Sequence, residues 1–127
     1  MNLNPPEIRA ITRIMFTLLV FVAATRVRAQ DADKGKQLYA QCVVCHAVTK
    51  ANGTGPGLAG IVGRKSGTAP GFRYSRAMKA ANLTWDARTL DAYLTDPQKV
   101  APGSVMPLSG VKDPKDRVDL VAYLKTL

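Results

Sequence analysis

The cysteines and the histidine of this chain all fall within one run of five residues. The run is Cys42-Val43-Val44-Cys45-His46, and the sequence holds no other Cys or His. C-x-x-C-H is the pattern of covalent haem attachment. Two intervening residues let one turn of chain present both thiols to the vinyl groups on one side of a porphyrin, and the next residue directs an imidazole at the iron. The sequence therefore predicts one haem c, bound through Cys42 and Cys45, with His46 as an iron ligand.

Other uses of two cysteines at this spacing fit the chain less well. A structural zinc site needs four ligands, and two Cys and one His leave the fourth without a candidate. A thioredoxin-like redox pair expects a βαβ pattern, which the sequence does not show. A disulfide between residues three apart closes a very small loop and gains little from loop entropy. Haem attachment is the interpretation that these residues favour.

The N-terminal segment has the pattern of a secretory signal peptide. Arg9 and Arg13 form a basic n-region, and residues 14–24 form an apolar h-region. Residues 27–29 then place small side chains at the −3 and −1 positions of a cleavage site. A helix that crosses a bilayer needs about twenty apolar residues, so the run is short for a membrane span. We predict that residues 1–29 are a cleaved signal peptide.

Cleavage would leave residues 30–127 as a single domain in the periplasm. The alternative is that residues 8–24 are retained as a membrane anchor. Residues 1–29 hold four arginines and one glutamate, so the formal charge falls from +9 for the whole chain to +6 for the cleaved form. A basic surface favours an acidic partner. The Lys and Arg residues are scattered and no recognition helix stands out, which argues against binding to nucleic acid.

Helical patterning is confined to short segments separated by loops. Three stretches combine a capping residue with helical spacing of apolar residues: from Asp31 or Asp33 toward Cys42, from Thr84 to Asp96, and from Asp113 onward with Pro114 at the first helical position. Residues 51–82 are rich in glycine and are predicted to hold at most a short helix near 75–80, and residues 100–110 are predicted to be extended. No strand alternation is evident, so the sequence predicts an all-α domain. A loop-rich chain of this size needs something to pack against.

Met106 is the candidate for the second axial ligand of the iron. Because His46 is the only histidine, two imidazoles from one chain are excluded, and Met, Lys or an open position remain. Met106 lies in a stiff extended loop at residues 102–107, whereas Met78, in a helical stretch at 76–81, is interpreted as core filler. Met/His ligation raises the reduction potential and fills both axial positions. These residues therefore favour electron transfer over chemistry on bound oxygen or peroxide.

Residues 33–127 resemble the class I cytochromes c, and specifically the mitochondrial-like branch found in bacteria. The resemblance implies a small all-α, single-domain fold of three to five helices wrapped around a covalent haem, with crossing N- and C-terminal helices. Gly35 and Tyr123 match the residues at that crossing. Beyond Cys42 to His46, the motifs that carry the resemblance are Gly55-Pro56-Gly57-Leu58, Gly63-Arg64-Lys65-Ser66-Gly67, Ala69-Pro70-Gly71-Phe72, Trp85, Tyr93-Leu94, Pro102-Gly103 with Met106, and Asp119-Leu120-Val121-Ala122-Tyr123-Leu124.

The resemblance also implies roles for individual residues around the haem. The carbonyl of Pro56 would accept a hydrogen bond from His46 and so fix the orientation of the ring. Five further side chains match residues that hold the haem propionates or lie beside the Met ligand: Arg64, Tyr74 and Trp85 for the propionates, and Tyr93 and Ser104 for the ligand.

Several positions depart from the family pattern. Gln41, Gln98 and Val105 stand where mitochondrial proteins carry lysines, and Met78 stands where many of them carry an asparagine. Fewer lysines argue against a strongly basic docking ring. We therefore expect a weaker encounter with the redox partner, one that salt screens less.

We therefore expect this protein to carry single electrons in the periplasm. We expect it to be a monomer and not an enzyme. The resemblance implies redox proteins as partners: a cytochrome bc complex, a terminal oxidase, a photosynthetic reaction centre or a periplasmic dehydrogenase. One alternative is a membrane-anchored electron-transfer subunit that uses residues 8–24 as its anchor. The other is a haem sensor or peroxidase with a labile Met106, for which the chain offers no second histidine as an acid–base group.

Overall fold

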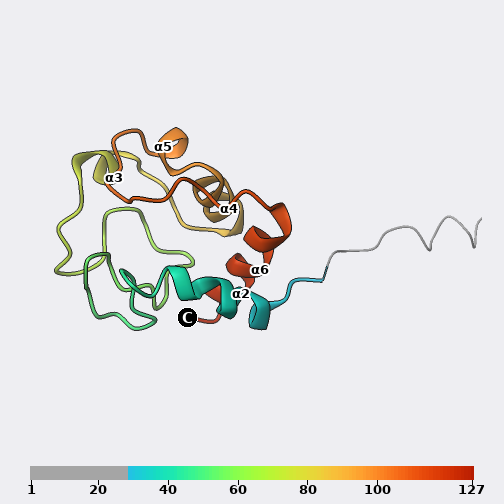
Figure 1. The fold of residues 1–127 in the computed structure, drawn as a ribbon. Helices are drawn as coiled ribbons and strands as arrows, with labels where there is room; N and C mark the ends of the chain where they lie inside the picture. Colours follow the sequence, from blue (N-terminus) through green and yellow to red (C-terminus); the bar gives the residue numbers. More distant parts are fainter. Residues whose placement is uncertain (1–28) are drawn as a thin grey trace, which may run out of the picture.

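Short helices joined by long loops make up residues 29–127, the part of the chain that the computed structural model describes (Figure 1). The predicted signal peptide therefore lies outside the described residues except for Ala29. Between residues 29 and 127 the only strand pairing is an isolated antiparallel bridge of Lys65 with Thr84, which agrees with the all-α prediction. The helical elements are α2 (Ala32–Leu38), the 3-10 turn η1 (Tyr39–Gln41), α3 (Arg76–Ala80), α4 (Ala87–Thr95), α5 (Pro97–Val100) and α6 (Pro114–Leu124).

Helices α2, α3 and α6 begin where the sequence predicts. Asp31, Ser75 and Asp113 each accept a hydrogen bond from a backbone N–H two or three residues further on, at 2.7–3.2 Å. Such side-chain acceptors satisfy N–H groups that have no partner inside the helix. Pro114 occupies the first turn of α6, where it loses no helical hydrogen bond. In the described part of the chain, no helix is long and apolar enough to span a membrane.

Two local predictions are wrong. Helix α4 begins at Ala87 and is capped by Asp86, whose carboxylate accepts from the N–H of Thr89 at 2.7 Å. Thr84 is not the cap, because it is extended and pairs with Lys65. The second concerns α5 (Pro97–Val100), a helix for which the sequence shows no predicted element.

Helix α5 starts directly after α4 ends. Asp96 terminates α4 with an extended backbone, and its carboxylate then caps α5. Pro97 prevents α4 from continuing, but it is well suited to the first position of a new helix. The chain therefore turns sharply here, and Pro97 becomes one of the most deeply buried residues.

The N- and C-terminal helices cross, as the resemblance implies. Figure 1 shows α2 and α6 side by side, and a Cβ atom at Gly35 would overlap the carbonyl of Asp119. Tyr39 and Tyr123 pack edge to face beside the crossing, with ring centroids 5.3 Å apart. The N–H of Asp31 donates to the buried carboxylate of Asp119 at 3.0 Å. The crossing thus fixes the start of α2 against the C-terminal helix.

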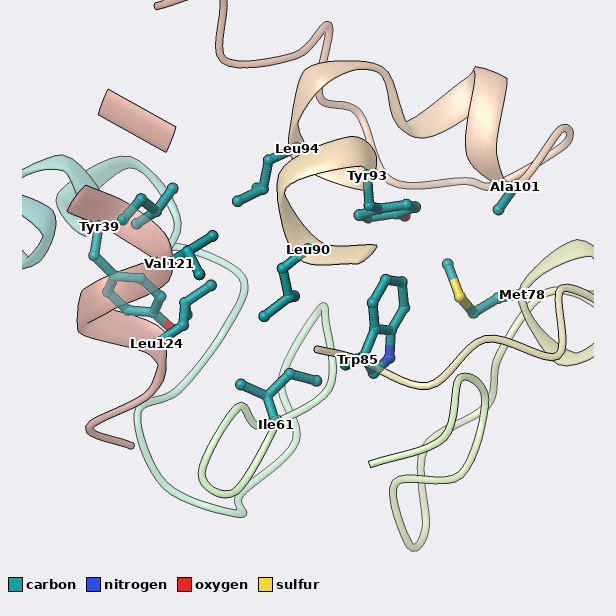
Figure 2. Close-up of a cluster of buried hydrophobic side chains, with 11 residues drawn as sticks. Tyr39, Ile61, Met78, Trp85, Leu90, Tyr93, Leu94, Ala101, Val121 and Leu124 are labelled. Carbon is teal, nitrogen blue, oxygen red and sulfur yellow. The ribbon is translucent and has the colours of Figure 1, made fainter. Parts of the chain in front are cut away.

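A single hydrophobic cluster joins α4, α6 and the loops (Figure 2). Within it, Trp85 and Tyr93 pack edge to face, with ring centroids 5.0 Å apart. Met78 is 9% exposed and belongs to the same cluster, as predicted for a core residue. The other buried members are Tyr39, Ile61, Leu90, Leu94, Ala101, Leu120, Val121 and Leu124.

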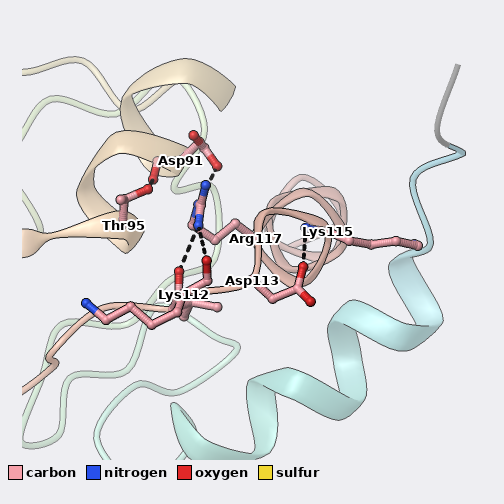
Figure 3. Close-up of polar contacts among 7 residues, drawn as sticks. Asp91, Thr95, Lys112, Asp113, Lys115 and Arg117 are labelled. Carbon is pink, nitrogen blue, oxygen red and sulfur yellow. Dashed lines mark hydrogen bonds and ion pairs between the residues drawn. The ribbon is translucent and has the colours of Figure 1, made fainter.

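Arg117 braces α6 against α4 at the edge of this core (Figure 3). Its Nε donates to the carboxylate of Asp91 on α4 at 2.8 Å. Its Nη1 donates to the carbonyls of Val111 and Lys112 at 2.9 and 3.1 Å. One guanidinium therefore ties together α4, α6 and the loop that leads into α6.

Candidate haem site

The cysteine motif lies where the first helical segment ends. Cys42 follows η1, and its N–H donates to the carbonyl of Tyr39 at 2.8 Å. The carbonyl of Cys42 then accepts from the N–H groups of Cys45 and His46 at 3.1 and 2.9 Å. These backbone bonds close one turn, which brings both thiols to the same stretch of surface. No disulfide joins the two cysteines, and both are of intermediate burial.

The imidazole of His46 is held by the loop that follows it. Nδ1 lies 2.8 Å from the carbonyl oxygen of Pro56, where the resemblance placed it. Because a carbonyl can only accept, Nδ1 carries the proton and Nε2 keeps a free lone pair for a metal. A Cβ atom at Gly55 would lie 2.7 Å from Nδ1, so only glycine lets the loop approach the ring this closely.

Tyr39 is a further member of the site, which no sequence motif singled out. Its hydroxyl donates to the backbone carbonyl of His46 at 2.7 Å, although the side chain is also buried in the hydrophobic cluster. Burial, with smaller contributions from Cys42 and Tyr123, raises the pKa of Tyr39 to about 12. No sequence signal distinguishes this hydroxyl, since a phenylalanine would satisfy the same hydrophobic spacing.

Met106 lies on a loop whose polar contacts converge on Tyr93 and Ser104. The hydroxyl of Tyr93 is 3.0 Å from Oγ of Ser104 and donates to Sδ of Met106 at 3.7 Å. The N–H of Met106 donates to the same Ser104 Oγ at 3.5 Å. Burial raises the pKa of Tyr93, partly offset by the bond with Ser104. The structure therefore brings Tyr93, Ser104 and Met106 together.

Arg64 and Trp85 are neighbours because two loops pair. The N–H of Trp85 donates to the carbonyl of Arg64 at 2.9 Å, next to the Lys65 bridge. Arg64 donates from Nη2 to the carbonyl of Gly57 at 3.0 Å, which leaves further guanidinium donors for an anion. Tyr74 is held separately: its hydroxyl accepts from the N–H of Ala69 at 3.3 Å and keeps its own proton to donate.

The donor set fits a haem better than a metal ion bound by side chains alone. Within residues 29–127 no three His, Cys, Asp or Glu side chains gather at one place. Burial, with a smaller contribution from the neighbouring Cys45, raises the pKa of the Cys42 thiol. An imidazole and a methionine thioether are the two axial ligand types of an electron-transfer haem.

Crossed terminal helices and these donors define a small helical protein that binds a c-type haem. Comparison with known proteins agrees: the family model "Cytochrome c" matches residues 32–127. The chain is 44% identical to cytochrome c2 of Rhodomicrobium vannielii over 93% of its own length and 96% of that protein. It is 46% identical to cytochrome c of Euglena viridis over 76% of its own length and 97% of that protein.

Comparison with solved structures supports the same family. The fold superposes on cytochrome cH from Methylobacterium extorquens with a TM-score of 0.73 and 46% sequence identity, covering 76% of this chain and 99% of that one. The chain belongs to the cytochrome c family. It is a bacterial class I cytochrome c that carries one covalent haem c, and its family function is electron transport.

Proposed function

We propose that this protein carries single electrons through a haem c attached to Cys42 and Cys45, with His46 and Met106 as the iron ligands. When bound, the haem iron supplies one-electron chemistry by alternating between the ferric and ferrous states. The observation that carries the proposal is the pair of oriented ligands. His46 keeps Nε2 free because Nδ1 is bonded to Pro56, and Met106 is held through its sulfur by Tyr93.

The remaining site residues support this arrangement. Arg64, Tyr74 and Trp85 are proposed to bind the propionates, since each offers an N–H or O–H donor for a carboxylate. Ser104 is proposed to orient the Tyr93 hydroxyl toward the ligand sulfur. With both axial positions filled, substrates have no access to the iron, so we propose an electron carrier and not an enzyme.

We further propose that residues 1–29 are removed on export and that residues 30–127 act as a monomeric periplasmic shuttle. Its partners would be membrane or periplasmic redox complexes: a cytochrome bc complex, an oxidase, a photosynthetic reaction centre or a dehydrogenase. Val44 and Val105, next to the cysteines and to Met106, are 80% and 81% exposed. Apolar side chains at these two positions support docking that relies less on charge.

Two measurements test the proposal. Redox titration of the exported protein should give one reversible one-electron step, and its mass should correspond to a chain that starts at Gln30 and carries one haem. The rate of electron transfer to isolated membranes should fall only slightly as salt is raised, because few docking charges are available to screen. Replacing Val105 with lysine should steepen that dependence. A steep fall for the unmodified protein would refute the proposed apolar docking.

A further inference from the structure

Gln98 lies on α5, the short helix that leads into the Met106 loop. The carboxylate of Asp96 accepts from the N–H groups of Gln98 and Lys99, both at 3.1 Å. Pro97, the residue before Gln98, is fully buried. The backbone of Gln98 is therefore fixed, and its side chain reaches the loop from a defined position.

The carboxamide of Gln98 makes two hydrogen bonds to the backbone of that loop. Its Nε2 donates to the carbonyl of Ser104 at 2.6 Å, and its Oε1 accepts from the N–H of Gly103 at 3.1 Å. A carboxamide carries a donor and an acceptor side by side, so it can bind a carbonyl and an N–H at once. A lysine could make only the first bond, and a glutamate only the second.

The loop backbone that Gln98 binds also positions the side chain of Ser104, whose hydroxyl contacts Tyr93 beside Met106. A turn closed by the bond from the Ser104 N–H to the carbonyl of Ala101, at 2.9 Å, has Gly103 at φ +88°. Ser104 Oγ contacts the Tyr93 hydroxyl, which donates to the sulfur of Met106. Fixing the backbone of Gly103 and Ser104 therefore fixes the group that contacts Met106.

We propose that Gln98 is a positioning residue that holds the Met106 loop closed and so sets how readily Met106 leaves the iron. The inference rests on the proposed function, because it takes Met106 to be the ligand. The pair of bonds from Gln98 to Gly103 and Ser104 is called the Gln98 clamp below.

The test measures how tightly imidazole binds the ferric holoprotein, because imidazole reaches the iron only when Met106 leaves. Gln98→Ala should tighten imidazole binding about tenfold, which is about 1.4 kcal/mol. Gln98→Glu should tighten it as well, since the carboxylate matches the amide in size but cannot donate to Ser104. Gln37→Ala is the matched control: Gln37 is an exposed glutamine on α2, and its replacement should leave the affinity unchanged.

A Met106→Ala background separates the clamp from the ligand assignment. There imidazole should bind much more tightly than in the wild type, and adding Gln98→Ala should have no further effect, because no methionine remains to be displaced. Wild-type affinity in both Gln98 variants would overturn the clamp while leaving Met106 as the ligand. Unchanged affinity in Met106→Ala itself would overturn the ligand assignment, and with it the clamp.

Discussion

The segment that carries Cys42, Cys45 and His46 is held mainly by its own backbone, whereas the segment that carries Met106 also depends on side chains from α4 and α5. On the first side, hydrogen bonds within residues 39–46 close one turn after η1. On the second side, the loop depends on Gln98, Tyr93 and Ser104. The backbone hydrogen bonds of the cysteine turn form and break together with the turn. The side-chain hydrogen bonds to the Met106 loop can break one at a time. The Met106 side is therefore expected to be the more easily opened of the two.

Removing the cysteines should have the largest effect of any change in the molecule. Cys42→Ala with Cys45→Ala removes both attachment points, so we expect no covalent haem and no stable fold around it. A haem stain on a denaturing gel, with the intact mass, measures this. Val44→Ala is the control, because Val44 is 80% exposed between the two cysteines and its replacement should keep the haem. Stained protein in the double variant would remove the motif from its role.

The two methionines of the domain should respond in opposite ways. Met106→Ala should lower the reduction potential strongly, because the thioether that favours ferrous iron is gone, and should cost less in unfolding free energy. Met78→Ala should cost about 2–5 kcal/mol of unfolding free energy, because Met78 is buried in the core, with a smaller change in potential. Redox titration and denaturant unfolding of both holoproteins measure the pair. If the reduction potential fell strongly in Met78→Ala and not in Met106→Ala, Met78 would be the ligand and Met106 the core residue.

The first side of the site could be predicted almost completely from the sequence, because its information is local. Five consecutive residues carry the motif, and Asp31 and Asp113 act as caps within three residues of the N–H groups they bind. The Met106 side could be predicted only in part. The proline after Asp96 ends α4, but it also begins α5, which sequence spacing does not indicate. The bonds of Gln98 join residues five and six apart outside any periodic pattern, so spacing alone could not reveal them.

The same limit applies to the buried hydroxyls and to one helix boundary. Hydrophobic spacing predicts that Tyr39 is buried, but not that its hydroxyl donates to His46. Thr84 is a good capping residue by type, yet it pairs with Lys65 from a distant loop, and Asp86 takes the cap instead. At Thr84, long-range pairing overrides local preference, whereas at Tyr39 the spacing predicts the burial but not the hydrogen bond.

Two tyrosine-to-phenylalanine changes compare the two sides directly. Tyr39→Phe and Tyr93→Phe each remove one buried hydroxyl, so each should cost about 1 kcal/mol of unfolding free energy. Only Tyr93→Phe should also weaken the hold on Met106 and tighten imidazole binding, because only Tyr93 donates to the methionine sulfur. Chemical denaturation with imidazole titration measures both effects. An equal change in imidazole affinity in the two variants would contradict the proposed division between the sides.

Low pH should weaken the contact between α2 and α6. Hydrogen bonds from Lys115 and from the N–H of Asp31 lower the pKa of Asp119. Because its pKa is lowered, ionised Asp119 stabilises the fold at pH values above about 3.9, the ordinary pKa of Asp. This stabilisation is lost as the pH falls below that value. Asp119→Asn should therefore flatten the loss of stability below about pH 4.

Thermal unfolding at a series of pH values measures the acid effect. Asp33→Asn is the control, since Asp33 is an exposed carboxylate in the first turn of α2. It should keep the wild-type dependence on pH. An Asp119→Asn variant with the full acid loss would show that another group is responsible.

The absorption spectrum of the oxidised holoprotein is the most direct test of ligation by His46 and Met106. We expect a weak red band from the bond between methionine sulfur and ferric iron. The band should persist in Met78→Ala and vanish in Met106→Ala. A folded, coloured wild-type protein without the band, or a band that survives Met106→Ala, would contradict ligation by Met106.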